Sequence, residues 1–142
     1  MAQSFSENQI IQMAQQEDSM LSNKKSYLNS LSNILLDTIK TIESLKEIQK
    51  KPKKLMMRLG AGVLVDVKIE QTESCQRTFS EKGYKKEKIS DTIKWLEDKK
   101  EKLGEQLTKV KSDIATSETR LTELMSIIKQ IEAEKAKNIS VK

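Results

Sequence analysis

A short β-type segment separates two long heptad stretches of this chain, and this arrangement limits how one copy can fold. The segment runs from Leu55 to Ile69, with Gly60 and Gly62 near its centre and β-branched residues at alternate positions after them. Alternating β-branched residues predict a strand with one buried face. The two glycines around Ala61 predict a bulge or a sharp turn that feeds this strand. Two long helices joined by strands cannot enclose a compact core within one chain, so the pattern predicts an assembly of subunits.

The clearest heptad pattern lies in the C-terminal half, where we expect a coiled-coil helix over about residues 89–137. Steps of alternately four and three residues keep apolar side chains on the face that meets a partner helix. These steps pass through Ile89, Ile93, Leu96, Lys100, Leu103, Leu107, Val110, Ile114, Ser117, Leu121, Leu124, Ile128 and Ile131. Lys100 and Ser117 are polar interruptions of the seam that can set its register.

The N-terminal half carries a weaker version of the same pattern, and we expect a second coiled-coil helix over about residues 7–49. Ser6 or Asn8 can cap its start, and Pro52 lies beyond its end because the residue before a proline disfavours helix. The steps pass through Ile10, Ala14, Glu17, Leu21, Lys24, Leu28, Leu31, Leu35, Thr38, Ile42 and Leu45. The two amphipathic helices are therefore expected to pack antiparallel, in a mainly α fold with a small β insert.

The insert over residues 53–88 is expected to be the assembly region of a single subunit that spans residues 1–142. A second pair of strands is predicted around Cys75–Ser80 and Gly83–Lys86, from a weaker pattern. A two-stranded hairpin alone is only marginally stable in water. We therefore expect these strands to pair with strands of other subunits through their free edges.

The composition argues against several other classes of protein. Only 36% of the residues are apolar and 33% are charged, which favours long helices over a large globular core. A lone cysteine, Cys75, excludes an internal disulfide framework and fits a reducing compartment. The sequence contains neither a long apolar run nor a signal-peptide pattern, so we expect a soluble, cytoplasmic protein without a membrane partner.

The sequence shows no pattern of catalytic or metal-binding residues. Histidine is absent, and no Walker A loop, dinucleotide-binding glycine motif or metal-ligand cluster is present. We therefore expect no enzymatic activity, no metal and no cofactor. The net charge of +5 includes a cluster at Lys50, Lys51, Lys53 and Lys54. This permits weak attraction to nucleic acid, but no groove-reading motif accompanies it, and solvated faces are the favoured interpretation.

The insert and the start of the second helix resemble a prefoldin subunit of the α class. The resemblance rests on Leu55, on Leu59-Gly60-Ala61-Gly62-Val63-Leu64-Val65, and on the helix opening Thr92-Ile93-Lys94-Trp95-Leu96-Glu97. Three features depart from the family pattern. Arg58 replaces a usual proline, residues 80–83 replace a second Gly-x-Gly stretch, and the net charge is positive. The first two departures put in question the first edge strand and the register of the second hairpin.

The resemblance implies an ATP-independent chaperone subunit of a hetero-hexamer. In this family two α-class and four β-class subunits join through their hairpins into a β-barrel. Coiled-coil tips capture unfolded or nascent polypeptides, which pass to a group II chaperonin. The assembly residues expected here are Leu59, Gly60, Ala61, Gly62, Val63, Val65, Val67 and Ile69. Trp95 is expected to pack the second helix against the sheet.

The client-binding residues are expected at the two helix ends that meet in an antiparallel pair. They are Ile10, Ile11, Met13, Met20, Met125, Ile127, Ile128 and Ile131. Ile10, Ile128 and Ile131 continue the heptad seam, so a role in the coiled-coil core is favoured for them. Ile11, Met13 and Ile127 lie off the seam and are the better client-binding candidates, because exposed apolar groups bind apolar stretches and Met adapts its shape.

Two functions from other classes remain open at this stage. The first alternative is a coiled-coil scaffold or a filament-forming prefoldin-like protein that transfers no client. A basic hairpin that binds nucleic acid is a third and weaker option. Suppression of client aggregation, homo-oligomer size and salt-sensitive binding to DNA or RNA separate the three.

Overall fold

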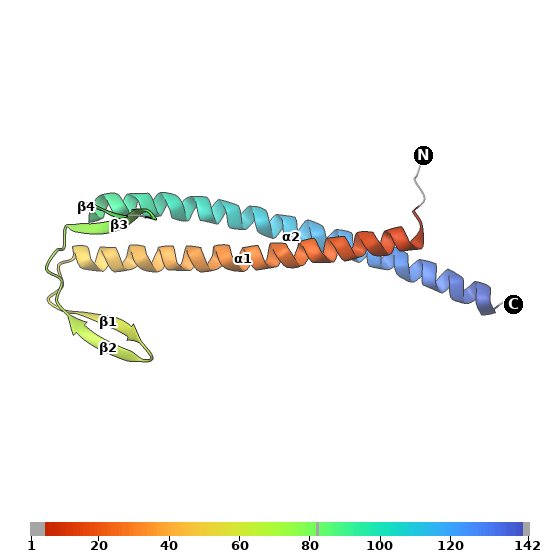
Figure 1. The fold of residues 1–142 in the computed structure, drawn as a ribbon, viewed down its shortest axis with the longest axis horizontal. Helices are drawn as coiled ribbons and strands as arrows, with labels where there is room; N and C mark the ends of the chain where they lie inside the picture. Colours follow the sequence, from red (N-terminus) through yellow and green to blue (C-terminus); the bar gives the residue numbers. More distant parts are fainter. Residues whose placement is uncertain (1–4, 82, 141–142) are drawn as a thin grey trace. The chain divides into compact units, whose positions relative to one another are not determined.

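The computed structural model describes residues 5–81 and 83–140, which form two helices with four strands between them (Figure 1). The elements are α1 (Glu7–Gln49), β1 (Leu55–Gly60), β2 (Val63–Val67), β3 (Ser74–Ser80), β4 (Gly83–Lys88) and α2 (Ile89–Ser140). The prediction of a mainly α chain with a small β insert is confirmed. The chain divides into two compact units. The terminal unit comprises Met1–Ser32 and Glu105–Lys142, and the hairpin unit comprises Asn33–Gly104.

Local side-chain and backbone contacts set both ends of α1. The Ser6 hydroxyl accepts a hydrogen bond from the Gln9 backbone N–H at 3.2 Å, and Gln9 Oε1 accepts one from the Ser6 N–H at 2.9 Å. This reciprocal pair is a capping box, which satisfies donors that the first turn leaves free. At the other end Lys51 adopts a φ of 54° and donates its N–H to the Ile48 carbonyl at 3.0 Å. Pro52 follows and cannot continue the helix.

Within the terminal unit, α1 and α2 bury the predicted heptad seam. The buried apolar residues of this unit are Ile10, Ala14, Leu21, Leu31, Leu107, Val110 and Ile114. Lys24 Nζ donates a hydrogen bond to Ser117 Oγ at 2.8 Å, and Ser117 is only 1% exposed. Ion pairs of Lys25 with Glu118 and of Lys135 with Glu7 join the same two helices. Glu7 near the start of α1 meets Lys135 near the end of α2, whereas Lys24 meets the earlier residue Ser117, so the two segments are antiparallel.

The Ser117 contact gives a first testable prediction. Ser117→Ala is expected to lower the free energy of unfolding by about 1 kcal/mol, because it removes the acceptor of a half-buried ammonium group. Chemical denaturation followed by circular dichroism measures the loss. The same substitution in a Lys24→Met background is expected to cost nothing further. An equal loss in both backgrounds would contradict the assignment of this hydrogen bond as the cause.

Within the hairpin unit, the buried seam continues, and the predicted pattern is wrong at one residue. The buried side chains are Thr38, Ile42, Ile89, Thr92, Leu96 and Leu103. The heptad pattern placed Lys100 in the seam, but this side chain is exposed. A lysine stem can follow the helix surface and keep its strongly hydrated ammonium group in water, which avoids the cost of burying a charge. Ser117 is therefore a buried polar interruption of the heptad pattern, whereas Lys100 is not.

The strands form two separate antiparallel hairpins, β1 with β2 and β3 with β4. In the first, Leu55 pairs with Val67 and Arg58 with Leu64, so the residue that replaces the family proline is paired, and the register shifts between Arg58 and Gly60. In the second, the register shifts between Thr78 and Ser80. Residue 82, in the second predicted turn, lies outside the described residues. Within the described part of the chain each sheet has only two strands, so the outer edge of each strand has no partner strand.

Candidate functional site

The first hairpin exposes a large share of apolar side chains. Their exposed fractions are 64% for Met56, 53% for Met57, 63% for Leu59, 50% for Val63 and 49% for Leu64. Exposed apolar side chains gathered on one hairpin in this way indicate a contact with another protein. Because the outer strand edges have no partner strand among the described residues, the hairpin can extend its sheet into another subunit.

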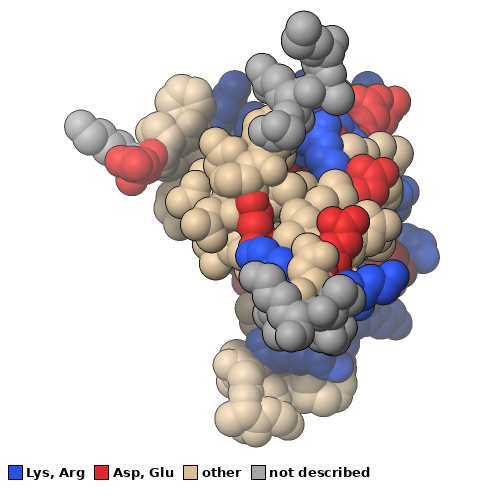
Figure 2. Space-filling view, turned by 90° about the vertical axis from the view of Figure 1, so that its right-hand side faces the viewer, with Lys and Arg blue, Asp and Glu red and all other residues tan. Residues whose placement is uncertain are grey.

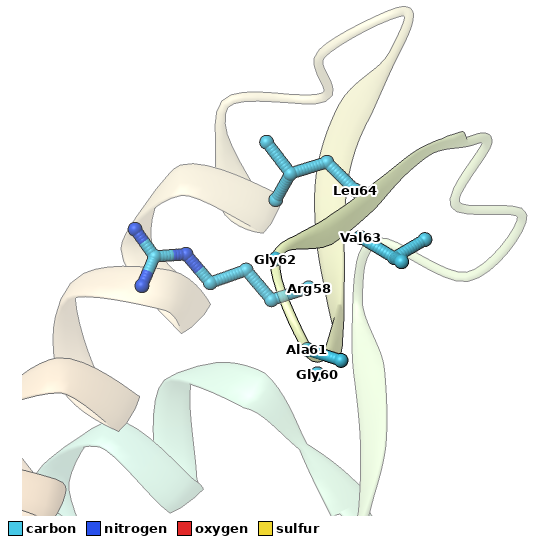
Figure 3. A pocket seen from close by; sticks show the side chains of 6 residues that line it. All are labelled: Arg58, Gly60, Ala61, Gly62, Val63 and Leu64. Carbon is cyan, nitrogen blue, oxygen red and sulfur yellow. The ribbon is translucent and has the colours of Figure 1, made fainter.

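The turn of this hairpin consists of three consecutive residues with positive φ. Gly60, Ala61 and Gly62 have φ values of 108°, 51° and 79°. This conformation favours glycine at the outer positions and is uncommon for alanine. The turn borders a shallow hollow, and Figure 3 shows Arg58 and Leu64 on one side of the hairpin and Val63 on the other. The turn thereby presents apolar side chains on both faces of β2.

The predicted assembly residues all lie on this hairpin or directly after it. Leu59 and Val63 are exposed, whereas Val65, Val67 and Ile69 are half-buried. Sequence reasoning missed two further aromatic residues on the second hairpin, Phe79 and Tyr84, which are both 72% exposed. Aromatic residues are few in this chain and are enriched in protein interfaces, so these two could have been identified as contact residues from the sequence.

A polar cluster attaches the second hairpin to the start of α2. Arg77 of β3 donates from Nε to Glu87 Oε1 at 2.7 Å and from Nη2 to Oε2 at 3.4 Å. The Thr92 hydroxyl of α2 donates to the same Glu87 oxygen at 2.5 Å, and the Cys75 sulfur lies 3.2 Å from the Thr92 hydroxyl oxygen. The Arg77 guanidinium stands 4.2 Å from the centre of the Trp95 ring. Trp95 thus packs against the sheet, as the sequence predicted, through a cation–π contact.

This cluster gives a pH-dependent prediction. The hydrogen bond that Glu87 accepts from Arg77, and next the one that it accepts from Thr92, hold the pKa of Glu87 below its ordinary value. A carboxyl with a lowered folded-state pKa stabilises the fold above its unfolded pKa of about 4.3 and loses this effect as the pH falls through the folded pKa. Acidification below about pH 4 is therefore expected to release the hairpin from α2. The fluorescence of Trp95, the single tryptophan, follows the release.

A Glu87→Gln variant provides the control for this titration. Glutamine keeps the shape but cannot titrate, so the Trp95 signal should lose its change below about pH 4. An acid midpoint that is identical in the wild type and in Glu87→Gln would contradict the role of this carboxyl.

The terminal unit has two shallow apolar grooves on either side of its buried seam. The Met13 groove is lined by Met13, Gln16, Glu17, Met20, Arg120, Glu123, Leu124 and Ile127. The Met125 groove is lined by Ile11, Ala14, Gln15, Asp18, Leu121, Met125 and Ile128. Both combine residues of α1 and α2, so each depends on the antiparallel pairing of the two helices.

The two grooves divide most of the predicted client-binding residues between them. Met13, Met20 and Ile127 line the first groove and are 39%, 49% and 41% exposed. The second groove contains Ile11, Met125 and Ile128, of which Met125 is 47% exposed and the other two are half-buried. The remaining two residues line neither groove. Ile10 is buried in the seam and Ile131 is half-buried beyond the grooves.

Charged side chains surround these grooves. Arg120 and Glu123 line the Met13 groove, and Asp18 lines the Met125 groove. On the face of the molecule in Figure 2, acidic and basic side chains lie among uncharged ones. Apolar side chains mixed with charged ones are typical of surfaces that contact other polypeptides.

Other kinds of site find no support in the described residues. Among residues 5–81 and 83–140, no group of His, Cys, Asp or Glu side chains is placed to hold a metal ion. In the same part of the chain, neither helix has an apolar stretch that could cross a membrane.

Two comparisons with known proteins found similarities to this chain. The model of the prefoldin subunit family matches residues 14–134. The fold is similar to that of a filamentous prefoldin from Methanocaldococcus jannaschii, solved by cryo-electron microscopy, with a TM-score of 0.63 and 14% sequence identity. The similarity covers 81% of this chain and 97% of the other. No curated protein matches the sequence.

Proposed function

Because this chain belongs to the prefoldin subunit family, we propose that it is an α-class subunit of an ATP-independent chaperone. Its hairpins join those of β-class subunits in a hetero-hexamer of two α-class and four β-class chains, with a barrel of shared strands. Its helix ends capture unfolded or nascent polypeptides in the cytoplasm and deliver them to a group II chaperonin. The subunit catalyses no reaction and uses no cofactor.

The observation that carries this proposal is the exposed apolar surface of the β1–β2 hairpin. Met56 and Leu59 are each more than 60% exposed in the single chain. Burial of a large apolar side chain stabilises a protein by about 1.5–3 kcal/mol. A subunit contact that covers five such side chains and pairs the free strand edges therefore has a large driving force. The hairpin alone lacks the third strand that independent stability requires.

The helix ends support the client-binding part of the proposal. The two grooves of the terminal unit expose Met13, Met20, Met125 and Ile127, and two of the four are on each helix. Methionine is unbranched and polarizable, so it adapts to apolar partners of many shapes. Several subunits in one assembly add avidity to contacts that are weak individually.

Native mass spectrometry of the chain, alone and mixed with a β-class subunit of the same source, tests the assembly. A hexamer that forms only in the mixture supports the hetero-oligomeric chaperone. Suppression of the aggregation of a chemically denatured client by this hexamer tests the capture of clients. A chain that stays monomeric in the mixture would overturn the proposal.

A homo-oligomeric filament is the second candidate, and one observation favours it. The similar fold described above is that of a filamentous prefoldin. Exposed apolar hairpins with free edges on every copy permit open-ended growth as well as closure into a ring. Large homo-oligomers that form without any β-class subunit and ignore its addition would favour this function.

A further inference from the structure

Helix α1 carries a second heptad series beside the buried seam in the terminal unit. We call this series the second seam. Its members also follow steps of alternately four and three residues, and they are Gln9, Met13, Gln16, Met20, Asn23, Tyr27 and Ser30. All seven are exposed, and the apolar members Met13, Met20 and Tyr27 are 39%, 49% and 52% exposed. Steps of this kind place side chains in line for contact with a further helix.

The second seam contains no charged residue. The matching outer series of α2 in the same unit is different, because it contains Lys109, Asp113, Arg120, Glu123, Glu134 and Lys137. The outer face of a solvated helix ordinarily carries charged residues. An uncharged face is cheaper to remove from water, since burial of a charge requires a partner charge at close distance. Gln, Asn and Ser both donate and accept hydrogen bonds, so they suit an uncharged polar partner.

We propose that the second seam binds an amphipathic helical segment of a non-native client, whose contacting face is apolar and uncharged. This inference rests on the proposed chaperone function and specifies which client segments the terminal unit selects. Met13 and Met20 also line the Met13 groove, so the second seam continues a surface already assigned to clients. From Met13 to Tyr27 it extends for about 21 Å, which matches a client helix of about four turns.

The width of the second seam favours a single helix over a second copy of this chain. One helix is about 10 Å across with its side chains, so it can cover α1 without covering the neighbouring charged series of α2. A second copy would bring two helices to the contact. Arg120 and Glu123 lie across the Met13 groove from Met13 and Met20. A contact with two helices would also cover Arg120 and Glu123, and burial of these charges is costly unless opposite charges pair with them.

Two synthetic peptides test the selection by charge. Both are four-turn amphipathic helices with the same leucine positions, and in one of them the polar positions that flank the leucines on the contacting face carry Gln, Ser and Asn. The other carries Glu and Lys in equal numbers, so that its net charge is also zero. Fluorescence anisotropy with the assembled full-length protein is expected to give at least tenfold tighter binding of the uncharged peptide. Because no ion pairs are involved, its affinity should not fall between low and high salt.

Single lysine substitutions locate the binding surface. Met20→Lys and Tyr27→Lys are each expected to weaken binding of the uncharged peptide at least fivefold, because they place a charge in the contact. Leu36→Lys is the matched control. Leu36 is on the same helix and is 52% exposed, as is Tyr27, but it does not follow the four–three steps. Its substitution is expected to change the affinity less than twofold.

Three outcomes would overturn this inference. They are equal binding of both peptides, an equal effect of Leu36→Lys, and association of the chain with itself that the Tyr27→Lys substitution abolishes while no peptide binds. The last outcome would assign the second seam to a second copy. Aggregation assays on the same preparations separate this inference from the proposed function. If the wild type suppresses client aggregation but does not discriminate between the peptides, only the inference about the second seam fails.

Discussion

The Val65→Lys variant is expected to remain a small species under conditions in which the wild type assembles with its partner subunits. Val65 is half-buried in β2 and pairs with Met57 of β1, at the centre of the exposed apolar hairpin. Burial of an ammonium group against apolar side chains has a large cost in free energy unless a carboxylate pairs with it. The helices do not contain this residue, so their folding should be unaffected. Native mass spectrometry measures the assembly, and circular dichroism measures the helix content.

Asp66→Lys is the matched control for this experiment. Asp66 is next to Val65 on the same strand, is exposed and projects from the opposite face because side chains alternate along a strand. Lysine at this position also places an ammonium group on β2, but on the face that it shares with Met56 and Arg58 rather than on the face of Met57 and Val65. It is expected to leave the mass of the assembly unchanged. A complex of normal size with Val65→Lys, or an equal defect with Asp66→Lys, would count against assembly through this face.

The two helices and the strand insert could be predicted because each depends on a periodic pattern within a short stretch of sequence. The four–three steps predicted the buried seam from Ile10 to Ile42, and the alternation of Val63, Val65 and Val67 predicted β2. The seam prediction was wrong at Lys100, which is exposed. Periodicity indicates which face of the helix a residue occupies, but not whether a long charged side chain can reach water from that face.

The contacts between the second hairpin and α2 could not be predicted from local patterns. Arg77, Glu87 and Thr92 come together only because β3 and β4 fold back on the first turns of α2. Nothing in the sequence around Arg77 indicates that its guanidinium will stack on Trp95, since 18 positions separate the two residues. A local pattern specifies the faces of an element, whereas a cluster of this kind depends on the docking of one element on another.

The division of the tip residues between core and surface is partly visible in the sequence. Residues on the heptad steps, such as Ile10, are removed from water, and residues off the steps, such as Met13 and Ile127, remain exposed. The buried seam alone does not indicate the second heptad series on α1. It becomes apparent only when exposure and the lack of charge are considered together with the spacing.

Replacement of Ile11, Met13 and Ile127 together by Ser is expected to weaken client binding strongly while the assembly keeps its mass. Met13 and Ile127 line one groove of the terminal unit, and Ile11 lines the other. Each substitution removes apolar surface that a non-native chain would cover, at about 25 cal/mol per Å² of buried area. The loss multiplies because several subunits contact one client. Suppression of the aggregation of a denatured client, measured at equal concentrations of assembled complex, quantifies the effect.

The chain contains a closely matched control for this triple variant. Ile34, Leu36 and Ile39 are also on α1, with Ile34 44% exposed, Leu36 52% exposed and Ile39 half-buried, but they belong to the hairpin unit. Their replacement by Ser removes a similar amount of apolar side chain and lowers helix propensity to a similar degree. If clients bind at the helix ends, this control retains aggregation suppression and the first variant loses it. An equal loss of aggregation suppression in the two variants would show that exposed apolar surface anywhere on the helices binds clients. The assignment of client binding to the two grooves would then be wrong.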